Sequence, residues 1–298
     1  MASGREIKTR IKSIQDTMKI TNAMYMISSA KLRKARANLE NTEPYFHMLQ
    51  GTIARILRHL PEMEHRYLED ETGYEKKNKK RGFIVITADK GLAGAYNHNV
   101  VKLTEKCLQS GEDDQLFVVG ELGREYFLQH KIPIGMQFRY TVQDPNLTRA
   151  RDISDYVVSL YEEKKLDEVY IIYTQSVNSM TEEAKVERLL PLKRSVFATA
   201  MLADVYAEDI RMVPSAQEVL NNVVPDYVAG FIYGALVESF CSEQNARMMA
   251  MKAATDNAEN ILKELQITYH HVRQGAITQE ITEVIAGARA QKQRRRKA

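Results

Sequence analysis

The longest unbroken pattern of apolar and polar positions in the chain lies between Ser215 and Ala288. Apolar residues recur there at steps of three and four, the spacing of one helix face and of a coiled-coil seam. The predicted seam consists of Met251, Ala254, Ala258, Ile261, Leu265 and Val272. The stepping resumes after a break near Gly275, with Ile277, Ile281, Val284 and Ala288. Ser215 and Glu218 form a capping box at the start. A single helix over this span would be about 110 Å long, too long to pack on one globule.

A second long helix is predicted for residues 3–57. Its seam begins with Ile7, Ile11, Ile14 and Met18 and continues at the same steps. A further apolar set lies off this seam and consists of Ile20, Ala23, Met24, Ile27 and Ala30. A two-stranded coil would leave that second side in water, so we expect something outside the pair to touch it. An ordinary bundle of three or four helices is the alternative for both long helices.

The region between the two helices has a different pattern. Residues 61–81 are predicted to be a solvated linker, because acidic residues are followed there by a run of Lys and Arg. Short apolar runs then begin at Phe83, Leu116 and Val169 and alternate with helical patterns, which is typical of βαβ units and a parallel sheet. Residues 184–190 alternate and stop before a proline, which predicts an antiparallel edge strand.

Together these patterns predict an α/β protein. The N- and C-terminal segments form a long antiparallel two-helix coiled coil, and a Rossmann-like domain of mainly parallel strands is inserted between them. The expected divisions are an N-terminal coiled-coil helix at 1–60, a charged linker at 61–81, the α/β domain at 82–192, a connection at 193–214, a C-terminal coiled-coil helix at 215–288 and a basic tail at 289–298.

Composition sets the class of protein. The 298 residues are 44% hydrophobic and 27% charged, which is normal for a soluble protein. No apolar run is long enough to span a membrane, and the N-terminus resembles neither a signal peptide nor a transit peptide. We therefore expect the chain to act in the compartment where it is made. Cys107 and Cys241 are far apart in sequence and are expected to be reduced, structural thiols.

The net charge of +3 is unevenly distributed. Residues 1–40 carry nine Lys and Arg residues against three acidic ones, and residues 289–298 carry six without any acid. Such runs suit nucleic acid, anionic lipid or an acidic protein partner. The interleaved aromatic residues of a single-strand binder are missing, since residues 1–40 contain only Tyr25. We therefore expect this basic surface to meet an acidic protein partner or solvent, and we expect no nucleic acid.

Candidate chemistry is sparse. The turn at residues 89–97 is glycine-rich like a phosphate-binding turn, but it fits neither G-x-x-x-x-G-K-[ST] nor G-x-G-x-x-G. A tight turn whose polar side chains dock on another element is favoured over nucleotide binding. His270 and His271 point about 100° apart on a helix, so they cannot share a metal ion as i, i+4 ligands can. No catalytic, metal or cofactor site stands out, which favours a mechanical or binding role.

Several stretches closely resemble the gamma subunit of F-type (H+-transporting) ATP synthase of the bacterial type. Residues 14–34 contain KITNAMYM and SAKLRK, residues 247–258 read RMMAMKAATDNA, and residues 273–285 read RQGAITQEITEVI. The turn at residues 89–97, which begins DKGL and ends in Asn, also matches. The resemblance extends over residues 5–288.

The resemblance implies a rotor in the central stalk of that enzyme. In the family, the two terminal helices form a left-handed antiparallel coiled coil inside a ring of three alpha and three beta subunits. The α/β domain lies against the epsilon subunit and the membrane c-ring. Proton flow turns the helix pair, whose different faces change the state of the three catalytic beta subunits in order, and ATP hydrolysis reverses the rotation. The implied subunit has no active site of its own and no cofactor.

The motif match carries beta-subunit contacts over to Met24, Lys90, Arg273 and Gln274. It implies a peripheral membrane protein on the cytoplasmic face of the bacterial cell membrane, held there only through the c-ring. The basic tail departs from the family pattern, and we expect it to be dispensable for coupled synthesis. Two alternatives stay open. A non-catalytic coiled-coil scaffold or adaptor with an α/β docking domain would self-associate, and an enzyme built on the α/β domain would bind nucleotide by itself.

Overall fold

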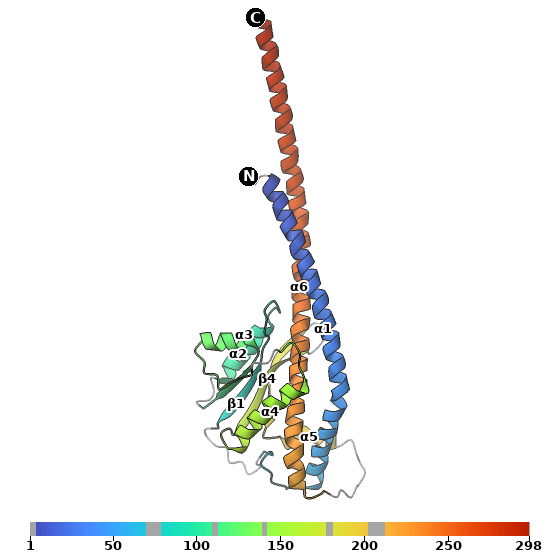
Figure 1. The fold of residues 1–298 in the computed structure, drawn as a ribbon, viewed down its shortest axis with the longest axis vertical. Helices are drawn as coiled ribbons and strands as arrows, with labels where there is room; N and C mark the ends of the chain where they lie inside the picture. The colour runs from blue at the N-terminus through green and yellow to red at the C-terminus, as the bar shows by residue number, and fades with distance from the viewer. Residues whose placement is uncertain are drawn as a thin grey trace. The chain divides into compact units, whose positions relative to one another are not determined.

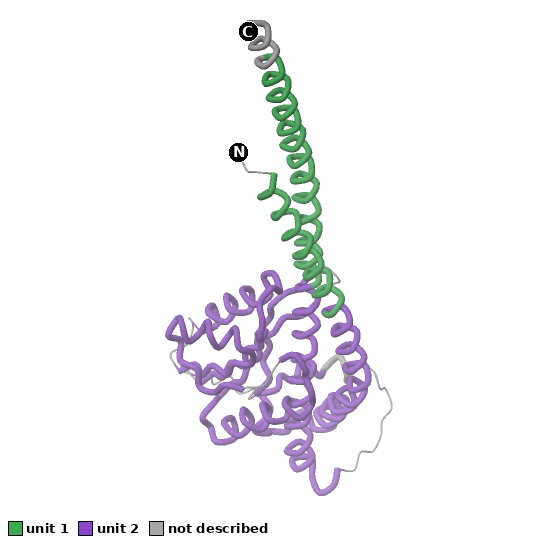
Figure 2. Tube along the Cα trace, turned by 45° about the horizontal axis from the view of Figure 1, so that its top comes forward, with its two compact units in different colours: residues 1–27, 248–298 green, residues 28–247 purple. Residues whose placement is uncertain are grey.

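The computed structural model describes residues 4–69, 79–108, 113–138, 142–176, 181–201 and 212–297. The chain forms two compact units, which are coloured separately in Figure 2. Unit 1 comprises Met1–Ile27 and Met248–Ala298, and unit 2 comprises Ser28–Arg247. Residues 70–78 of the predicted linker and residues 202–211 of the predicted connection lie outside the described residues.

Two long helices run through both units (Figure 1). Helix α1 spans Gly4–His59 and helix α6 spans Ala216–Lys297. The Ser215 hydroxyl caps α6, since Oγ accepts a hydrogen bond of 3.2 Å from the backbone N–H of Glu218, as the capping box predicts. The sequence predicted an end at Ala288, but the helix continues to Lys297 because nothing after that alanine breaks it. No helix among the described residues is long and apolar enough to cross a membrane.

Unit 2 contains the predicted sheet. The strands are β1 at Arg81–Ile86, β2 at Gln115–Val119, β3 at Met136–Phe138, β4 at Glu168–Ser176 and β5 at Glu182–Leu190. They lie in the order β3-β2-β1-β4-β5, and every pair is parallel except β4 with the edge strand β5. The predicted α/β fold with mainly parallel strands and an antiparallel edge is confirmed. Strand β3 was not predicted, because three residues give too short a pattern to recognise.

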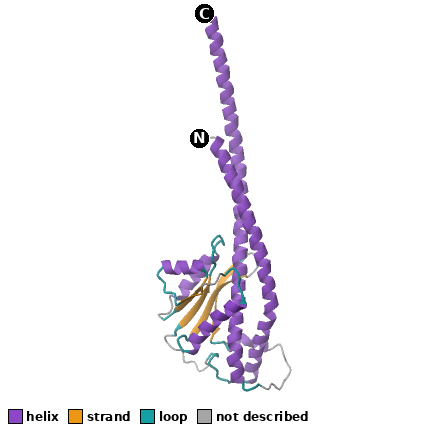
Figure 3. Ribbon diagram, in the orientation of Figure 1, coloured by secondary structure: helices purple, strands orange, loops and turns teal. Residues whose placement is uncertain are grey.

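Helices cover both faces of the sheet (Figure 3). The further helices are α2 at Tyr96–Leu108, α3 at Glu121–Gln129, α4 at Leu147–Glu162 and α5 at Arg194–Met201. Side chains of alternate strand residues, such as Val85 and Val118, pack with α2 and α3 on one face. On the other face, Phe117 of β2 contacts α4 and Tyr173 of β4 contacts Phe231 of α6. Helix α5 lies at the start of the segment 193–214, which the sequence predicted only as a connection.

Helices α1 and α6 also pack on each other within unit 2. They approach closely at Gly230, where an added Cβ would lie 1.9 Å from the ring of Phe46. The segment after α1 differs from its prediction as a solvated linker. Tyr67 is 0% exposed and stacks on Tyr161, and Leu68 forms a bridge to Leu192. The many charged residues around Tyr67 made the segment look solvated. One buried aromatic ring, however, stabilises the packed position of the chain more than the neighbouring acidic residues oppose it.

Candidate functional site

The two helical segments of unit 1 form an antiparallel pair. The hydroxyl oxygens of Thr21 and Thr255 are 2.7 Å apart. A Cβ added at Gly4 would lie 3.9 Å from Cγ1 of Val272. The two contacts are separated by seventeen residues on each helix, in opposite chain directions, so the register is constant between them. On the α1 side, the predicted seam residues Ile7, Ile11, Ile14 and Met18 are buried or half-buried.

The α6 side of this pair differs from the prediction at two positions, because Thr255 takes the place of Ala254 and Leu262 takes the place of Ile261. Met251 is buried, and Ala254, Ala258, Leu265 and Val272 are half-buried. Ile261, however, is 44% exposed, and its neighbour Leu262 is half-buried instead. The residues that face α1 are Met251, Thr255, Ala258, Leu262, Leu265, Tyr269 and Val272. Their steps alternate strictly between four and three, which is the period of 3.5 that keeps a seam on its partner, and Ile261 lies one residue off it.

Unit 1 leaves a second apolar side of α1 uncovered among the described residues. Ile20, Met26 and Ile27 are exposed, and Met24 is half-buried between that side and the seam. Together with Ala23 they form a stripe of apolar side chains, which we call the α1 stripe. It contains four of the five off-seam residues that the sequence singled out, and a two-helix pair cannot cover it.

The end of α6 has no partner helix among the described residues. The first described residue of α1, Gly4, is level with Val272, and every residue from 273 to 289 is exposed. We call residues 273–289 the α6 tip. It carries the apolar side chains Ile277, Ile281, Val284 and Ile285, as well as Arg273 and Gln274. Apolar residues at helical spacing on an uncovered helix are typical of a surface that a partner covers.

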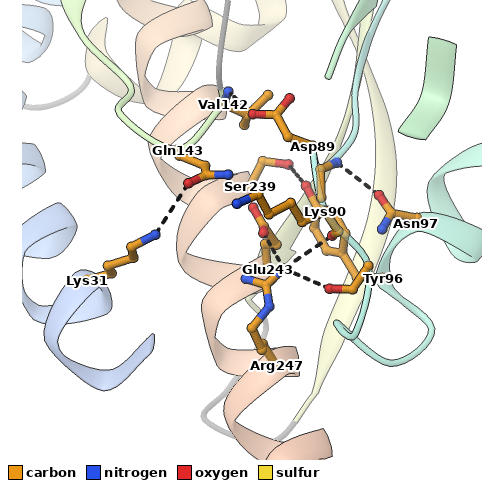
Figure 4. A network of polar contacts seen from close by, with 12 residues as sticks. Lys31, Asp89, Lys90, Tyr96, Asn97, Val142, Gln143, Ser239, Glu243 and Arg247 are labelled. Carbon is orange, nitrogen blue, oxygen red and sulfur yellow. Dashed lines mark hydrogen bonds and ion pairs between the residues drawn. The ribbon is translucent and has the colours of Figure 1, made fainter. Parts of the chain in front are cut away.

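The fourth predicted contact residue, Lys90, lies in unit 2 in the turn between β1 and α2 (Figure 4). Asp89 organises this turn: its two carboxylate oxygens accept hydrogen bonds from the backbone N–H groups of Glu121 and Val142, at 3.2 and 2.9 Å. The side-chain oxygen of Asn97 accepts a 2.9 Å bond from the N–H of Ala88. The start of α3 is therefore occupied by a carboxylate, which disfavours a bound phosphate there.

Helix α6 also contacts this turn, through hydrogen bonds to its backbone. The guanidinium of Arg247 donates hydrogen bonds to the carbonyl oxygens of Lys90 and Gly91, at 3.2 and 3.1 Å. It also forms an ion pair of 2.7 Å with Glu243, one helical turn earlier. Nearby, the hydroxyl of Tyr96 lies 2.7 Å from that of Ser239. The prediction that the polar side chains of this turn dock on another element is confirmed for Asp89, which binds the start of α3, and for Tyr96, which contacts α6.

Burial gives this contact unusual electrostatics. Glu243 is 2% exposed, and burial raises the pKa of its carboxyl group, an effect that the charge of Arg247 opposes. Burial likewise raises the pKa of Tyr96. Both groups are shielded from solvent, and Glu243 is paired with Arg247 while Tyr96 is hydrogen-bonded to Ser239, which fits a structural joint better than proton transfer to a substrate. Among the described residues, no three His, Cys, Asp or Glu side chains gather as metal ligands.

Sequence reasoning found the turn but missed Arg247, Glu243 and Ser239. A signal was present, since residues 228–241 are almost wholly apolar and the next residues include an acid and a base at i, i+4. Charged side chains directly after such a stretch are shielded from water, so both are expected to have hydrogen-bond or ion-pair partners within the protein. Of the four predicted contact residues, Met24, Arg273 and Gln274 belong to unit 1, and Lys90 belongs to unit 2.

Comparison with known proteins gives a consistent result. The family profile described as ATP synthase matches residues 3–291. The ATP synthase gamma chain of Ruminiclostridium cellulolyticum is 45% identical, over 96% of this chain and 98% of that protein. The ATP synthase gamma chain of Acetivibrio thermocellus is 43% identical, over 98% of this chain and 100% of that protein. A relative from Acetobacterium woodii, 36% identical over 96% of this chain and 98% of its own length, is named a sodium-ion-specific ATP synthase gamma chain.

Solved structures of similar fold come from ATP synthases. A chain from the central stalk and c-ring structure of the Tetrahymena thermophila mitochondrial ATP synthase has a TM-score of 0.60 and 25% identity, and the match covers 79% of this chain and 99% of that chain. A chain of the Euglena gracilis mitochondrial ATP synthase has a TM-score of 0.67 at 16% identity and covers 96% of this chain and 94% of its own. At that identity, the second likeness concerns the fold alone.

Proposed function

This chain belongs to the ATP synthase gamma-chain family, and from that premise we propose that it is the central-stalk rotor of an F-type ATP synthase. The helix pair of unit 1 turns inside a hexamer of three alpha and three beta subunits. Unit 2 provides the contacts with the epsilon subunit and the c-ring. The chain carries no active site. It changes the nucleotide affinity of each beta subunit by presenting a different face to it, and the coupling is reciprocal, so ATP hydrolysis turns the rotor in reverse.

The observation that carries this proposal is the uncovered α6 tip. Residues 273–289 extend about 25 Å beyond the level of Gly4, at ~1.5 Å per residue. An isolated helix with exposed Ile277, Ile281 and Val284 is unfavourable in water, and its stability depends on a partner that covers those side chains. The α1 stripe gives the same support lower on the helix pair.

Four residues are proposed as contacts with beta subunits. Arg273 and Gln274 begin the α6 tip and are exposed, so they are available to hydrogen-bond a beta-subunit loop. Met24 is the half-buried member of the α1 stripe, and Lys90 is exposed on the turn that Arg247 holds. The surplus of Lys and Arg in residues 1–40 suits acidic beta-subunit segments, which would be attracted over roughly one Debye length of 8 Å.

The proposed coupling ion is the proton, and the proposed location is the cytoplasmic face of the bacterial cell membrane. The chain reaches the membrane only through the c-ring. One relative is named a sodium-ion-specific gamma chain, so the identity of the coupling ion needs an experiment of its own. Inverted vesicles that contain the complete enzyme should acidify during ATP hydrolysis, and the rate should not depend on sodium. Hydrolysis that requires sodium and leaves the vesicle pH unchanged would contradict the proton assignment.

The central experiment is reconstitution of the full chain with three alpha and three beta subunits. Size-exclusion chromatography with mass measurement should give one copy per hexamer. A bead attached to the exposed Leu128 position of unit 2, through a cysteine introduced there, should rotate in discrete steps under ATP. Failure to enter a hexamer, with stable dimers of the chain alone, would instead favour the scaffold. Nucleotide binding by the isolated chain would favour the enzyme alternative.

The contact residues have their own test in the same assembly. Replacing Arg273 and Gln274 together with alanine should lower ATP-driven torque severalfold without changing the melting temperature of the isolated chain, because both side chains are exposed. The matched control is Lys263→Ala, an exposed residue on the same helix within the paired region. Equal torque in both variants would remove Arg273 and Gln274 from the contact set.

A further inference from the structure

Leu92 has an unusual combination of backbone and environment. Its φ angle is 64°, in the left-handed region, and its side chain is 64% exposed. Left-handed φ is disfavoured for leucine because Cβ approaches the following carbonyl oxygen, and glycine or asparagine avoids or tolerates this contact. Glycines stand close by on both sides, at positions 91 and 94, so the turn already contains the residue type that this conformation prefers.

Neither local conformation nor packing within the described fold accounts for a leucine here. A residue kept in a strained conformation points to a requirement outside local folding. An apolar side chain this exposed contributes little to the stability of unit 2. The remaining reason to place leucine at this position is a contact with another molecule.

The backbone of the turn is held in place on both sides of Leu92. Arg247 of α6 fixes the carbonyl oxygens of Lys90 and Gly91, immediately before Leu92. On the other side, the N–H of Tyr96 donates to the carbonyl oxygen of Ala93, and the Tyr96 ring is buried. A backbone held in place before binding needs less ordering on binding, which favours affinity.

Charge near Leu92 indicates the kind of surface it meets. The exposed ammonium group of Lys90 lies two residues away and makes no ion pair with any residue that the structure describes. The neighbouring Asp89 directs its two carboxylate oxygens to the backbone N–H groups of Glu121 and Val142. The tip of the turn therefore offers one apolar group beside one positive charge.

We propose that Leu92 is an apolar anchor that inserts into a recess of a partner subunit, beside a carboxylate that pairs with Lys90. This inference rests on the proposed function, under which the turn faces a beta subunit. The anchor adds a contact that Lys90 alone cannot make. It also explains why α6 devotes a buried Arg247 to the backbone of this turn: the hydrogen bonds keep Leu92 in its binding position.

The decisive variant is Leu92→Asn in the full chain, because asparagine tolerates left-handed φ but removes the apolar anchor. The melting temperature of the isolated chain should stay the same or rise by about 2 °C. Release of the labelled chain from the three-alpha, three-beta hexamer should become about tenfold faster, as expected for the loss of a half-buried leucine. Leu92→Met keeps both the strain and the apolar group and should release at the wild-type rate.

The matched control is Leu128→Gln, which changes another leucine of unit 2 that is 49% exposed, and it should leave release unchanged. Two outcomes would overturn the anchor: an unchanged release rate for Leu92→Asn, or a melting temperature several degrees lower, which would mean that Leu92 packs within the chain. If the wild-type chain itself does not enter the hexamer, the proposed function fails and the anchor fails with it. A wild-type chain that enters and a Leu92→Asn variant that behaves identically would refute the anchor alone.

Discussion

Replacing Arg247 with methionine should weaken unit 2 in a way that depends on pH. The side chain of Arg247 forms a 2.7 Å ion pair with Glu243 and donates to two carbonyl oxygens of the β1–α2 turn. Methionine keeps the apolar stem and helix propensity but removes the charge and the donors. Glu243, which is 2% exposed, would then be a buried carboxyl group without its counter-charge.

The magnitude follows from the cost of leaving a buried charge unpaired. Removing one partner of a buried ion pair typically lowers the free energy of unfolding by about 3–5 kcal/mol. Burial already raises the pKa of Glu243 above its usual value of 4.5, and the charge of Arg247 opposes that rise. Without Arg247 the pKa rises further, so the carboxyl group stays protonated and neutral to higher pH.

The sign of the pH dependence is therefore defined. An acid whose pKa is higher in the folded state binds its proton more tightly there, so stability is greatest below 4.5 and falls as pH rises toward the folded pKa. The loss caused by Arg247→Met should be larger at pH 8 than at pH 5. At pH 5, the remaining loss in free energy of unfolding comes mainly from the missing hydrogen bonds between Arg247 and the turn. Each hydrogen bond from a charged donor contributes no more than about 1.5–3 kcal/mol.

Urea unfolding of the isolated chain at both pH values, followed by far-ultraviolet circular dichroism, measures these differences. The control is the double variant Glu243→Gln, Arg247→Met, which removes both charges. It should recover a large part of the stability lost at pH 8 and lose the added pH dependence. A double variant as unstable as the single one, or an Arg247→Met effect that does not shrink at pH 5, would refute the assignment of a buried, Arg-compensated Glu243.

Three further predictions concern packing and the chain end. Gly230→Ala should destabilise unit 2 by about 1–3 kcal/mol, because the new Cβ would overlap an aromatic ring of α1. Gly234→Ala should instead stabilise α6 by roughly 0.5–1 kcal/mol, because the structure leaves open space at that position. Thermal unfolding of both variants measures the difference. Thr255→Val should cost about 0.5–1.5 kcal/mol by removing the partner of the buried Thr21 hydroxyl, and the double valine variant should be closer to wild type in the same melts. Deleting residues 289–298 should leave coupled ATP synthesis nearly intact in reconstituted vesicles, and loss of assembly would contradict it.

Local patterns were sufficient for the elements and their layers. The apolar runs that begin at Phe83, Leu116 and Val169 became β1, β2 and β4, and the alternating run at 184–190 became the antiparallel edge strand. These patterns are readable because burial on one or both faces of a sheet fixes the residue type at each position. The three residues of β3 carry no such pattern, and their pairing with β2 depends on the neighbouring strand.

The seam shows where a helical pattern stops being sufficient. Ile261 and Leu262 are adjacent and equally apolar, so either satisfies a step of three or four from Ala258. Only the antiparallel register with α1 selects Leu262, since a period of 3.5 must hold over the whole contact. The same register places Gly4, the first described residue of α1, level with Val272, so no described residue of α1 lies beside the α6 tip.

Local sequence patterns were enough to establish two long helices with apolar seams and an inserted, mainly parallel sheet, and they favoured a docking role for the polar turn at residues 89–97. Those features depend on residues that are close together in the chain. Apolar residues at steps of three and four indicate a helix, and alternation at steps of two indicates a strand. Only the tertiary structure decided that Arg247 holds the turn and that Leu92 is both strained and exposed. Arg247 is separated from Lys90 by more than half of the chain, and contacts over such distances depend on how whole elements pack.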